Sequence, residues 1–171
     1  MANLFDVTSA LRTPGQEFPV VKNLQIEDLE LSGDPIRFEN IALRGAVMSA
    51  EDRVSLRAHV DAQLKSRCVR CLGGVEMPIS AEVDAVYARD EDAENPDLYL
   101  FKASAIDLAE AARDALLLEV PIRILCGEDC AGLCPVCGVD RNAESCTCKA
   151  GGGAVNPFEA LKEFVHNDEE V

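Results

Sequence analysis

The chain has 171 residues, of which 48% are apolar and only 5% aromatic, so aliphatic side chains must supply its core. A formal net charge of −15 excludes a protein that wraps nucleic acid with its whole surface, because phosphate binding depends on lysine and arginine. The first twenty residues lack a basic start and an apolar run, and no stretch approaches the roughly 20 apolar residues of a membrane span. We therefore expect a soluble, cytoplasmic protein without a membrane partner.

The first 35 residues carry few secondary-structure signals, and Pro14, Gly15 and Pro19 interrupt what pattern there is. A turn is predicted at 33–35. Beyond it, apolar residues predict a strand over 38–47, in which Gly45 breaks the alternation. Two further stretches alternate cleanly between apolar and polar residues, over 54–65 and 75–87. Their short connection predicts an antiparallel hairpin.

The hairpin connection, residues 66–74, contains Cys68 and Cys71. A tight turn that directs two sulfurs to one point is typical of a zinc knuckle. We expect the glycines that follow, Gly73 and Gly74, to provide the positive φ that such a turn requires.

An acidic run over 90–97 indicates a solvated loop, and 99–102 predicts a short strand. Asp107 then caps a helix, with Glu110 three residues later, and Pro121 ends it. The apolar stripe that we expect to pack against the sheet consists of Leu108, Ala111, Ala112, Ala115 and Leu118.

A second short helix is predicted from Asn156, which is a good helix cap and is followed by proline. Its apolar face consists of Phe158, Leu161, Phe164 and Val165.

All eight cysteines fall into four close pairs, which are Cys68 and Cys71, Cys126 and Cys130, Cys134 and Cys137, and Cys146 and Cys148. In a reducing compartment such pairs are typical of metal binding, with structural disulfides or free thiols as the alternatives. Eight thiolates fit two tetrahedral Zn²⁺ ions with no open position, which argues against catalysis. We expect neither His59 nor His166 to be a ligand, and we expect no enzyme.

The thiols can be paired in two ways. In the arrangement that we prefer, Cys68 and Cys71 join Cys126 and Cys130, and the last four cysteines close a local site over a short loop. In the alternative, the two Cys-x-x-Cys knuckles share one metal and the other four cysteines share the second.

Together these elements predict an α+β fold with a mainly antiparallel sheet, a zinc-knuckle hairpin, one packed helix and a cysteine-rich, zinc-ribbon-like C-terminal module. The predicted parts are an α+β domain over 1–125, the zinc module over 126–150, and a glycine-rich linker with a short helix over 151–171.

A local excess of positive charge surrounds the hairpin, with Arg53, Arg57, Lys65, Arg67 and Arg70 in one stretch against a single carboxylate. These cations either offset the charge of the thiolates or contact RNA phosphates. In the second interpretation the contact residues are Lys65, Arg67 and Arg70.

An ordered set of motifs resembles a known family. The motifs are CVRCL at 68–72, IDL at 106–108, LLLEVP at 116–121, the cysteine pair at 126 and 130, GLCPVCG at 132–138 and NPFxxL at 156–161. With them the chain resembles the YceD family of large ribosomal RNA subunit accumulation proteins over about residues 37–165. The resemblance implies a role in the accumulation or processing of large-subunit (23S) rRNA, and no enzymatic activity.

Our hypothesis is therefore a non-catalytic ribosome-biogenesis factor in which zinc fixes the hairpin tip and the C-terminal module as one surface. Its partners would be pre-ribosomal large-subunit rRNA or a basic ribosomal protein, which the acidic chain would attract. The alternatives are a generic zinc-dependent protein-interaction module and a thiol-based redox or metal sensor.

Overall fold

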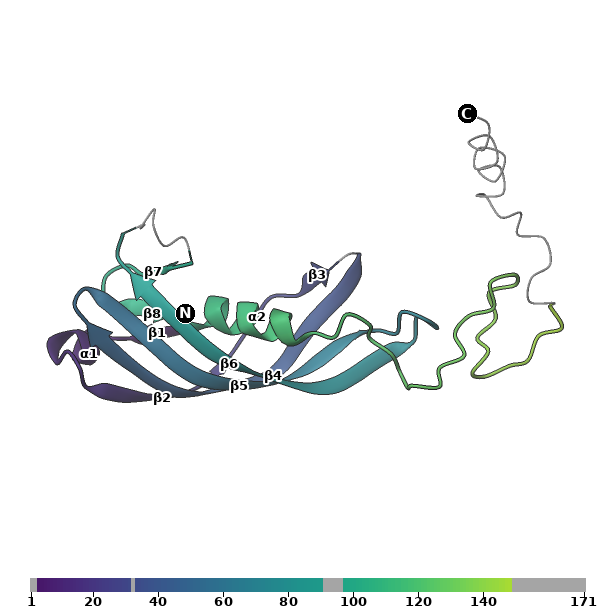
Figure 1. Cartoon of the computed structure of the whole chain (residues 1–171), viewed down its shortest axis with the longest axis horizontal. Coiled ribbons are helices and arrows are strands. Elements are labelled where there is room, and N and C mark those ends of the chain that lie inside the picture. Colours follow the sequence, from purple (N-terminus) through teal and green to yellow (C-terminus); the bar gives the residue numbers. More distant parts are fainter. Residues whose placement is uncertain (1–2, 32, 91–96, 149–171) are drawn as a thin grey trace, which may run out of the picture.

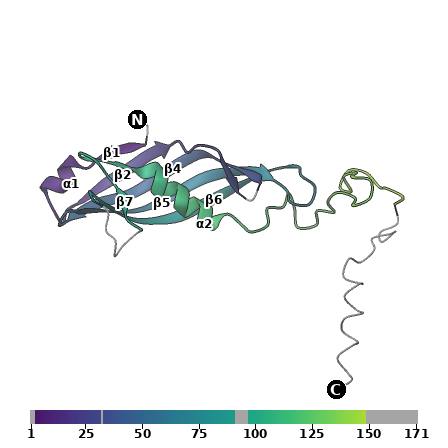
Figure 2. The same cartoon turned by 90° about the horizontal axis from the view of Figure 1, so that it is seen from above.

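The computed structural model describes residues 3–31, 33–90 and 97–148. Over these ranges a long sheet dominates an elongated molecule, and one helix lies on a face of that sheet (Figures 1 and 2). In chain order the elements are β1 (Leu4–Asp6), α1 (Thr8–Arg12), β2 (Glu17–Leu24), β3 (Leu29–Leu31), β4 (Asp34–Ala50), β5 (Arg53–Arg67), β6 (Gly74–Ala88), β7 (Tyr99–Leu100), β8 (Ala105–Asp107) and α2 (Leu108–Glu119).

The main sheet has the strand order β2-β4-β5-β6-β7, and all neighbours are antiparallel except β6 and β7, which are parallel. β3 pairs with the first residues of β4, and β1 pairs with β8 in a separate two-stranded ladder. The predicted α+β fold with a mainly antiparallel sheet is confirmed.

The predicted hairpin is formed by β5 and β6, in continuous register from Val54↔Tyr87 to Arg67↔Gly74. Alternate residues of β5 face the core, and Leu56, Val60 and Leu64 are fully buried. The opposite face carries charged side chains that pair across the strands, as between Lys65 and Glu76. The period of two in the sequence therefore predicts both faces of this hairpin correctly.

β4 differs from the prediction, because Gly45 does not interrupt it. The irregularity is a bulge between Glu39 and Ala42, with Asn40 at a φ of 53°, which shifts the alternation so that both Phe38 and Ile41 are buried. Gly45 stays in register with Ala58, and a Cβ there would lie 2.2 Å from the carbonyl oxygen of Arg57. Glycine is needed at this position because β4 and β5 approach so closely.

Helix α2 packs on β6 and closes the core above the sheet. The carboxylate of Asp107 accepts a hydrogen bond from the backbone N–H of Ala109 at 2.9 Å, as its predicted capping role requires. The helix ends at Glu119 because proline at 121 disfavours helical geometry in the residue before it. The prediction for Leu118 is wrong, since its side chain is 86% exposed; Leu116 is the buried residue near this end of the helix.

The N-terminal part holds more structure than its sequence indicates. Pro19 lies inside β2, which tolerates proline because it is an edge strand of the sheet. Gly33 has a φ of 90° in the predicted turn, whereas Asp34 and Pro35 already belong to β4. The predicted helix from Asn156 and the segment 151–171 lie outside the described residues.

Candidate metal centres

The first knuckle lies at the tip of the β5–β6 hairpin. The backbone N–H of Cys68 donates to the carbonyl oxygen of Gly73 at 2.8 Å, and the N–H of Leu72 donates to that of Cys68 at 2.9 Å. Leu72 takes the left-handed conformation with a φ of 62°, so the expectation that Gly73 or Gly74 would do so is wrong. The tight turn itself forms as predicted.

The second knuckle, at Cys134 and Cys137, repeats this hydrogen-bond pattern in a loop. The N–H of Cys134 donates to the carbonyl oxygen of Val139 at 2.8 Å, and the N–H of Gly138 donates to that of Cys134 at 2.9 Å. Gly138, at the position equivalent to Leu72, has a φ of 76°. The same turn is thus built twice, and only in the second is the left-handed residue glycine.

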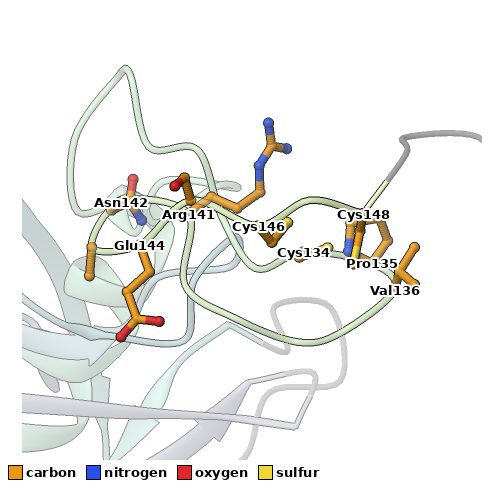
Figure 3. Close-up of a pocket in the computed structure, with 10 residues that line it drawn as sticks. Cys134, Pro135, Val136, Arg141, Asn142, Glu144, Cys146 and Cys148 are labelled. Atoms are coloured by element: carbon orange, nitrogen blue, oxygen red, sulfur yellow. The ribbon is translucent and has the colours of Figure 1, made fainter.

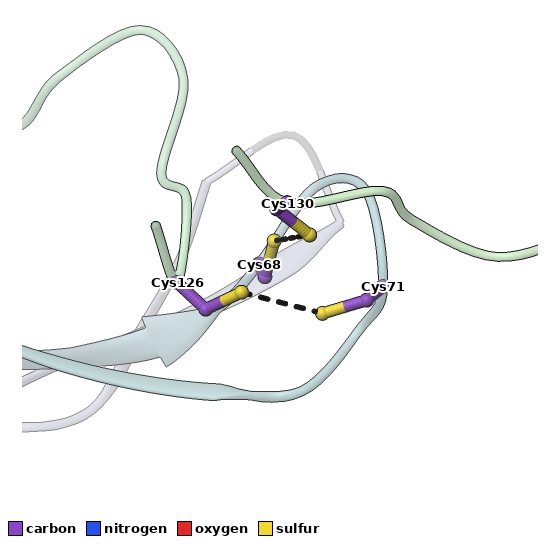
Figure 4. Close-up of side chains that lie close together, drawn as sticks. All are labelled: Cys68, Cys71, Cys126 and Cys130. Atoms are coloured by element: carbon purple, nitrogen blue, oxygen red, sulfur yellow. Dashed lines mark hydrogen bonds between the residues drawn. The ribbon is translucent and has the colours of Figure 1, made fainter. Parts of the chain in front are cut away.

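Four thiols meet at the hairpin tip, as Figure 4 shows, and their Sγ atoms all lie within 4.8 Å of one another. The Sγ atoms of Cys68 and Cys130 are 3.8 Å apart, and those of Cys71 and Cys126 are 3.6 Å apart. A tetrahedral ion with Zn–S bonds of about 2.3 Å would place its sulfurs roughly 3.8 Å apart. Disulfide sulfurs lie at about 2.05 Å, and all eight cysteines are free thiols. The group therefore fits a tetrahedral metal ion.

Backbone hydrogen bonds bring Cys126 and Cys130 to the tip. The N–H of Val69 donates to the carbonyl oxygen of Ile124 at 3.0 Å, and the N–H of Leu133 donates to that of Arg70 at 2.9 Å. The two ends of the 124–133 segment are thus bonded to the two residues between Cys68 and Cys71.

Two further contacts tighten this arrangement. The Arg70 guanidinium donates to the carbonyl oxygens of Glu128 and Cys130, at 3.3 and 2.9 Å. Gly132 has a φ of 68°, and a Cβ there would lie 2.9 Å from the carbonyl oxygen of Arg70. Only a residue without a side chain allows so close an approach of the two backbones.

The second group consists of Cys134, Cys137, Cys146 and Cys148, whose Sγ atoms also lie within 4.8 Å of one another. Three of these cysteines line a pocket of about 470 Å³, shown in Figure 3. The two groups correspond to the preferred pairing, not to the alternative in which the knuckles share one metal. The zinc-ribbon-like character of the module stays a prediction.

Asn142 connects the two groups, and the sequence analysis missed it. Its side-chain amide donates to Cys130 Sγ at 3.4 Å, and its Oδ1 accepts from the N–H of Ala131 at 2.8 Å. Asp140 fixes the Asn142 side chain through a 2.7 Å hydrogen bond. The Asp-x-Asn spacing indicates a local turn, but it does not reveal that the asparagine reaches a cysteine of the other group.

The thiols of each group differ in acidity. Burial raises the pKa of Cys68, but hydrogen bonds from the N–H groups of Cys71, Arg70 and Cys126 outweigh it and lower that pKa to about 6. The side chains of Cys130 and Cys71 raise the pKa of Cys126 to about 12. Hydrogen bonds thus favour one thiolate in the group, while the neighbouring sulfurs oppose a further one.

The second group repeats this division. Backbone N–H groups of Cys137 and Val136 lower the pKa of Cys134 to about 6. The side chain of Cys137 raises the pKa of Cys148 to about 12. Four thiolates could share either site only if a cation offset their charge, and a dication such as Zn²⁺ would do so. Both groups could therefore hold a metal ion, and their chemistry is compatible with zinc.

The three cations predicted to contact RNA have different environments. Lys65 pairs with Glu39 at 3.0 Å and with Glu76 at 3.2 Å. Arg70 binds backbone carbonyls of the docked segment. Arg67 is exposed and has no ion-pair partner among the described residues.

His59 hydrogen-bonds to Glu82 at 2.9 Å and to Asp61 at 3.2 Å on the open face of the sheet. His166 lies outside the described residues. Across the described ranges, no helix has the length and apolar character needed to cross a membrane.

Fold and site together define a class: α+β proteins with a long antiparallel sheet and two four-cysteine groups able to hold metal ions. The family model described as "Large ribosomal RNA subunit accumulation protein YceD" matches residues 56–165. The chain belongs to the YceD family.

Relatives match over different parts of the chain. An uncharacterized protein of Mycobacterium tuberculosis is 30% identical over an alignment of 152 positions, which covers 81% of this chain and 70% of that protein. The uncharacterized protein YlbN of Bacillus subtilis is 25% identical over 92% of this chain and 93% of its own length. A chloroplastic maize protein, named large ribosomal RNA subunit accumulation protein YCED homolog 1, is 38% identical over 35% of this chain and 22% of its own length. No solved structure matches the chain.

Proposed function

We propose that this protein is a non-catalytic ribosome-biogenesis factor that supports the accumulation and processing of large-subunit (23S) rRNA in the cytoplasm. The observation that carries this proposal is the family match, which covers the hairpin knuckle, helix α2 and both cysteine groups. The name of the maize relative points to the same process.

Metal ions would act structurally in this function. Cys68 and Cys71 would hold one Zn²⁺ together with Cys126 and Cys130, and the remaining four cysteines would hold a second. Four thiolates fill a tetrahedral coordination sphere, so no position remains at which a substrate or water could be activated. The ions would hold the hairpin tip and the 126–148 segment as one surface that meets pre-ribosomal rRNA or a basic ribosomal protein.

The proposal is tested in cells by deleting the gene and separating ribosomal subunits on sucrose gradients. We expect fewer large subunits relative to small subunits, and restoration of the ratio by the native gene. A double variant, Cys71→Ser with Cys126→Ser, should fail to restore it because the clamp at the hairpin tip is lost. An exposed-residue variant such as Arg57→Gln serves as the control and should restore it. A normal subunit ratio in the deletion strain would refute the proposed function.

A further inference from the structure

A small antiparallel loop joins the two cysteine groups. Residues 131–133, which directly follow Cys130, lie against residues 139–142. The N–H of Arg141 donates to the carbonyl oxygen of Gly132 at 3.0 Å, and an isolated antiparallel bridge joins the same two stretches. The second knuckle forms the turn of this loop, so the loop begins beside the first group and carries half of the second.

Asn142 lies where this loop returns to the first group. Its Nδ2 is 3.4 Å from Cys130 Sγ, and among the residues that the structure describes no other N–H group donates to that sulfur. In Figure 3, Asn142 lies at the end of the pocket away from Cys148. The residue therefore belongs to the loop of the second group, while its side chain contacts a cysteine of the first.

An N–H group directed at a metal-bound thiolate stabilises the negative charge on sulfur and holds the ligand in its orientation. Removal of such a partner typically lowers metal affinity about 10–100-fold. The first group has another donor of this kind in the backbone N–H of Arg70, which is 3.4 Å from Cys68 Sγ. Arg70, however, is part of the first knuckle, whereas Asn142 comes from the loop of the second group.

The position of Asn142 depends on the second group. The carboxylate of Asp140 orients it by accepting hydrogen bonds from its Nδ2 at 2.7 Å and from its backbone N–H at 2.9 Å. Cys137 lies five residues before Asn142 and Cys146 four residues after it, so an ion held by these cysteines would fix both ends of this segment. Otherwise a few exposed hydrogen bonds hold the segment, and such segments open readily.

We propose that the two groups bind zinc cooperatively and that Asn142 transmits the coupling. When the second group holds its ion, the loop is fixed and presents the Asn142 amide to Cys130, and the first group binds zinc about tenfold more tightly. Since binding free energies are reciprocal, a filled first group favours the second by the same factor. This inference rests on the proposed zinc sites but not on the role in rRNA accumulation.

The coupling matters when zinc is scarce. It favours chains with both groups filled over chains with only one, so the hairpin tip and the 134–148 segment become ordered together. Each group still holds an ion without the other, because the free energy of zinc binding to a structural thiolate site far exceeds a tenfold change.

The test compares zinc association constants of the full chain, measured against a competing chelator under reducing conditions. The native chain gives the product of the two constants. Cys137→Ser with Cys148→Ser gives the constant of the first group alone, and Cys71→Ser with Cys126→Ser gives that of the second group alone. The coupling factor is the native product divided by the product of the two single constants, and we expect it to be about ten.

Asn142→Ala, introduced into all three proteins, should reduce the coupling factor to about one. Any effect of this substitution on the folding of the loop itself changes the second group's constant in both products and cancels, so a merely structural role would leave the factor at ten. Ser145→Ala is the matched control, because it removes an exposed polar side chain that bonds to neither group in the described ranges of the same loop. It should keep the factor at about ten.

A native coupling factor close to one would overturn the inference, since the two groups would then bind zinc independently. A factor of ten that persists in Asn142→Ala would also overturn it and would assign the coupling to other contacts, such as the hydrogen bond between Leu133 and Arg70. A reduced chain that binds no zinc would refute the proposed metal sites together with this inference.

The outcome for the proposed function is separate. If gene deletion reduces large subunits while the native coupling factor is one, only this inference fails. If Asn142→Ala abolishes a factor of ten and deletion leaves the subunit ratio normal, only the proposed function fails.

Discussion

At the scale of single residues, the sequence predicts best where a side chain acts on its near neighbours. Asp107 caps α2 because its partner, the N–H of Ala109, is two residues away. The bonds of Arg70 could not be predicted, since its acceptors are the carbonyl oxygens of Glu128 and Cys130 about sixty residues later. The left-handed conformation of Leu72 also escapes prediction, because a leucine adopts it only when the surrounding turn imposes it.

His59 predicts a pH dependence at this scale. The hydrogen bond to Glu82 raises the pKa of His59 above 6.5, and Asp61 adds to the effect despite partial desolvation. A raised pKa means that the protonated ring stabilises the fold below about pH 6.5, and that this stability is lost as the pH rises through the folded-state pKa.

We therefore expect His59→Gln to unfold at a lower urea concentration than the native chain at about pH 5.5, and at nearly the same concentration at about pH 9. Comparing the two proteins at each pH cancels the titration of the groups that do not interact with His59, so the remaining difference belongs to His59 with Asp61 and Glu82. An equal difference at both pH values would contradict a role for the charged imidazole.

At the scale of elements, the long strands and α2 could be predicted because each buries one face along its whole length. β1 and β3 have three residues each, too few for a period to be recognised, and β1 is defined by its pairing with β8 about a hundred residues later. Leu118 fits helical spacing, yet it lies at the margin of the stripe, and α2 buries Leu116 instead. Which margin of a helix is covered depends on the neighbouring elements.

The docking of the 124–133 segment onto the hairpin tip gives a prediction for Arg70. Because its guanidinium makes charge-assisted hydrogen bonds to two carbonyls, Arg70→Ala should weaken docking by about 1–2 kcal/mol. The backbone N–H groups of Val69 and Leu133, which bond across this contact, should then exchange with solvent about tenfold faster.

Arg67→Ala is the matched control, since it removes an exposed arginine of the same hairpin that makes no such bonds. Unchanged exchange at Val69 and Leu133 in Arg70→Ala would show that the backbone hydrogen bonds hold the segment without help from the guanidinium.

At the scale of the whole molecule, the grouping of the thiols could be predicted from the entropic cost of loop closure. The last four cysteines lie within fifteen residues of chain and come together locally, so one long-range closure is enough for the first group. No sequence pattern predicts the contacts that connect the segment of the second group to the first group. These contacts are the hydrogen bond from Asn142 to Cys130 and the close approach of Gly132 to Arg70.

Metal content tests this arrangement. The native chain, purified under reducing conditions, should carry about two zinc ions, one for each four-thiolate group. Cys71→Ser with Cys126→Ser should reduce this to about one and speed exchange of the Val69 N–H, since this group connects the docked segment to the tip.

The matched variant, Cys137→Ser with Cys148→Ser, should also carry about one zinc ion but keep Val69 protected, because the second group closes locally. A reduced native chain that binds no metal and yet keeps Val69 and Leu133 protected would contradict a structural role for the metal ions.

The edge strand β2 has a consequence for how copies of this protein coexist at high concentration. Val21 on this strand is 79% exposed, and an unpaired strand edge invites addition of another chain and growth of fibrils. Pro19, which has no backbone N–H to offer an incoming strand, discourages such addition. The proline that obscured this strand in the sequence thus helps to protect the folded protein against edge-to-edge aggregation.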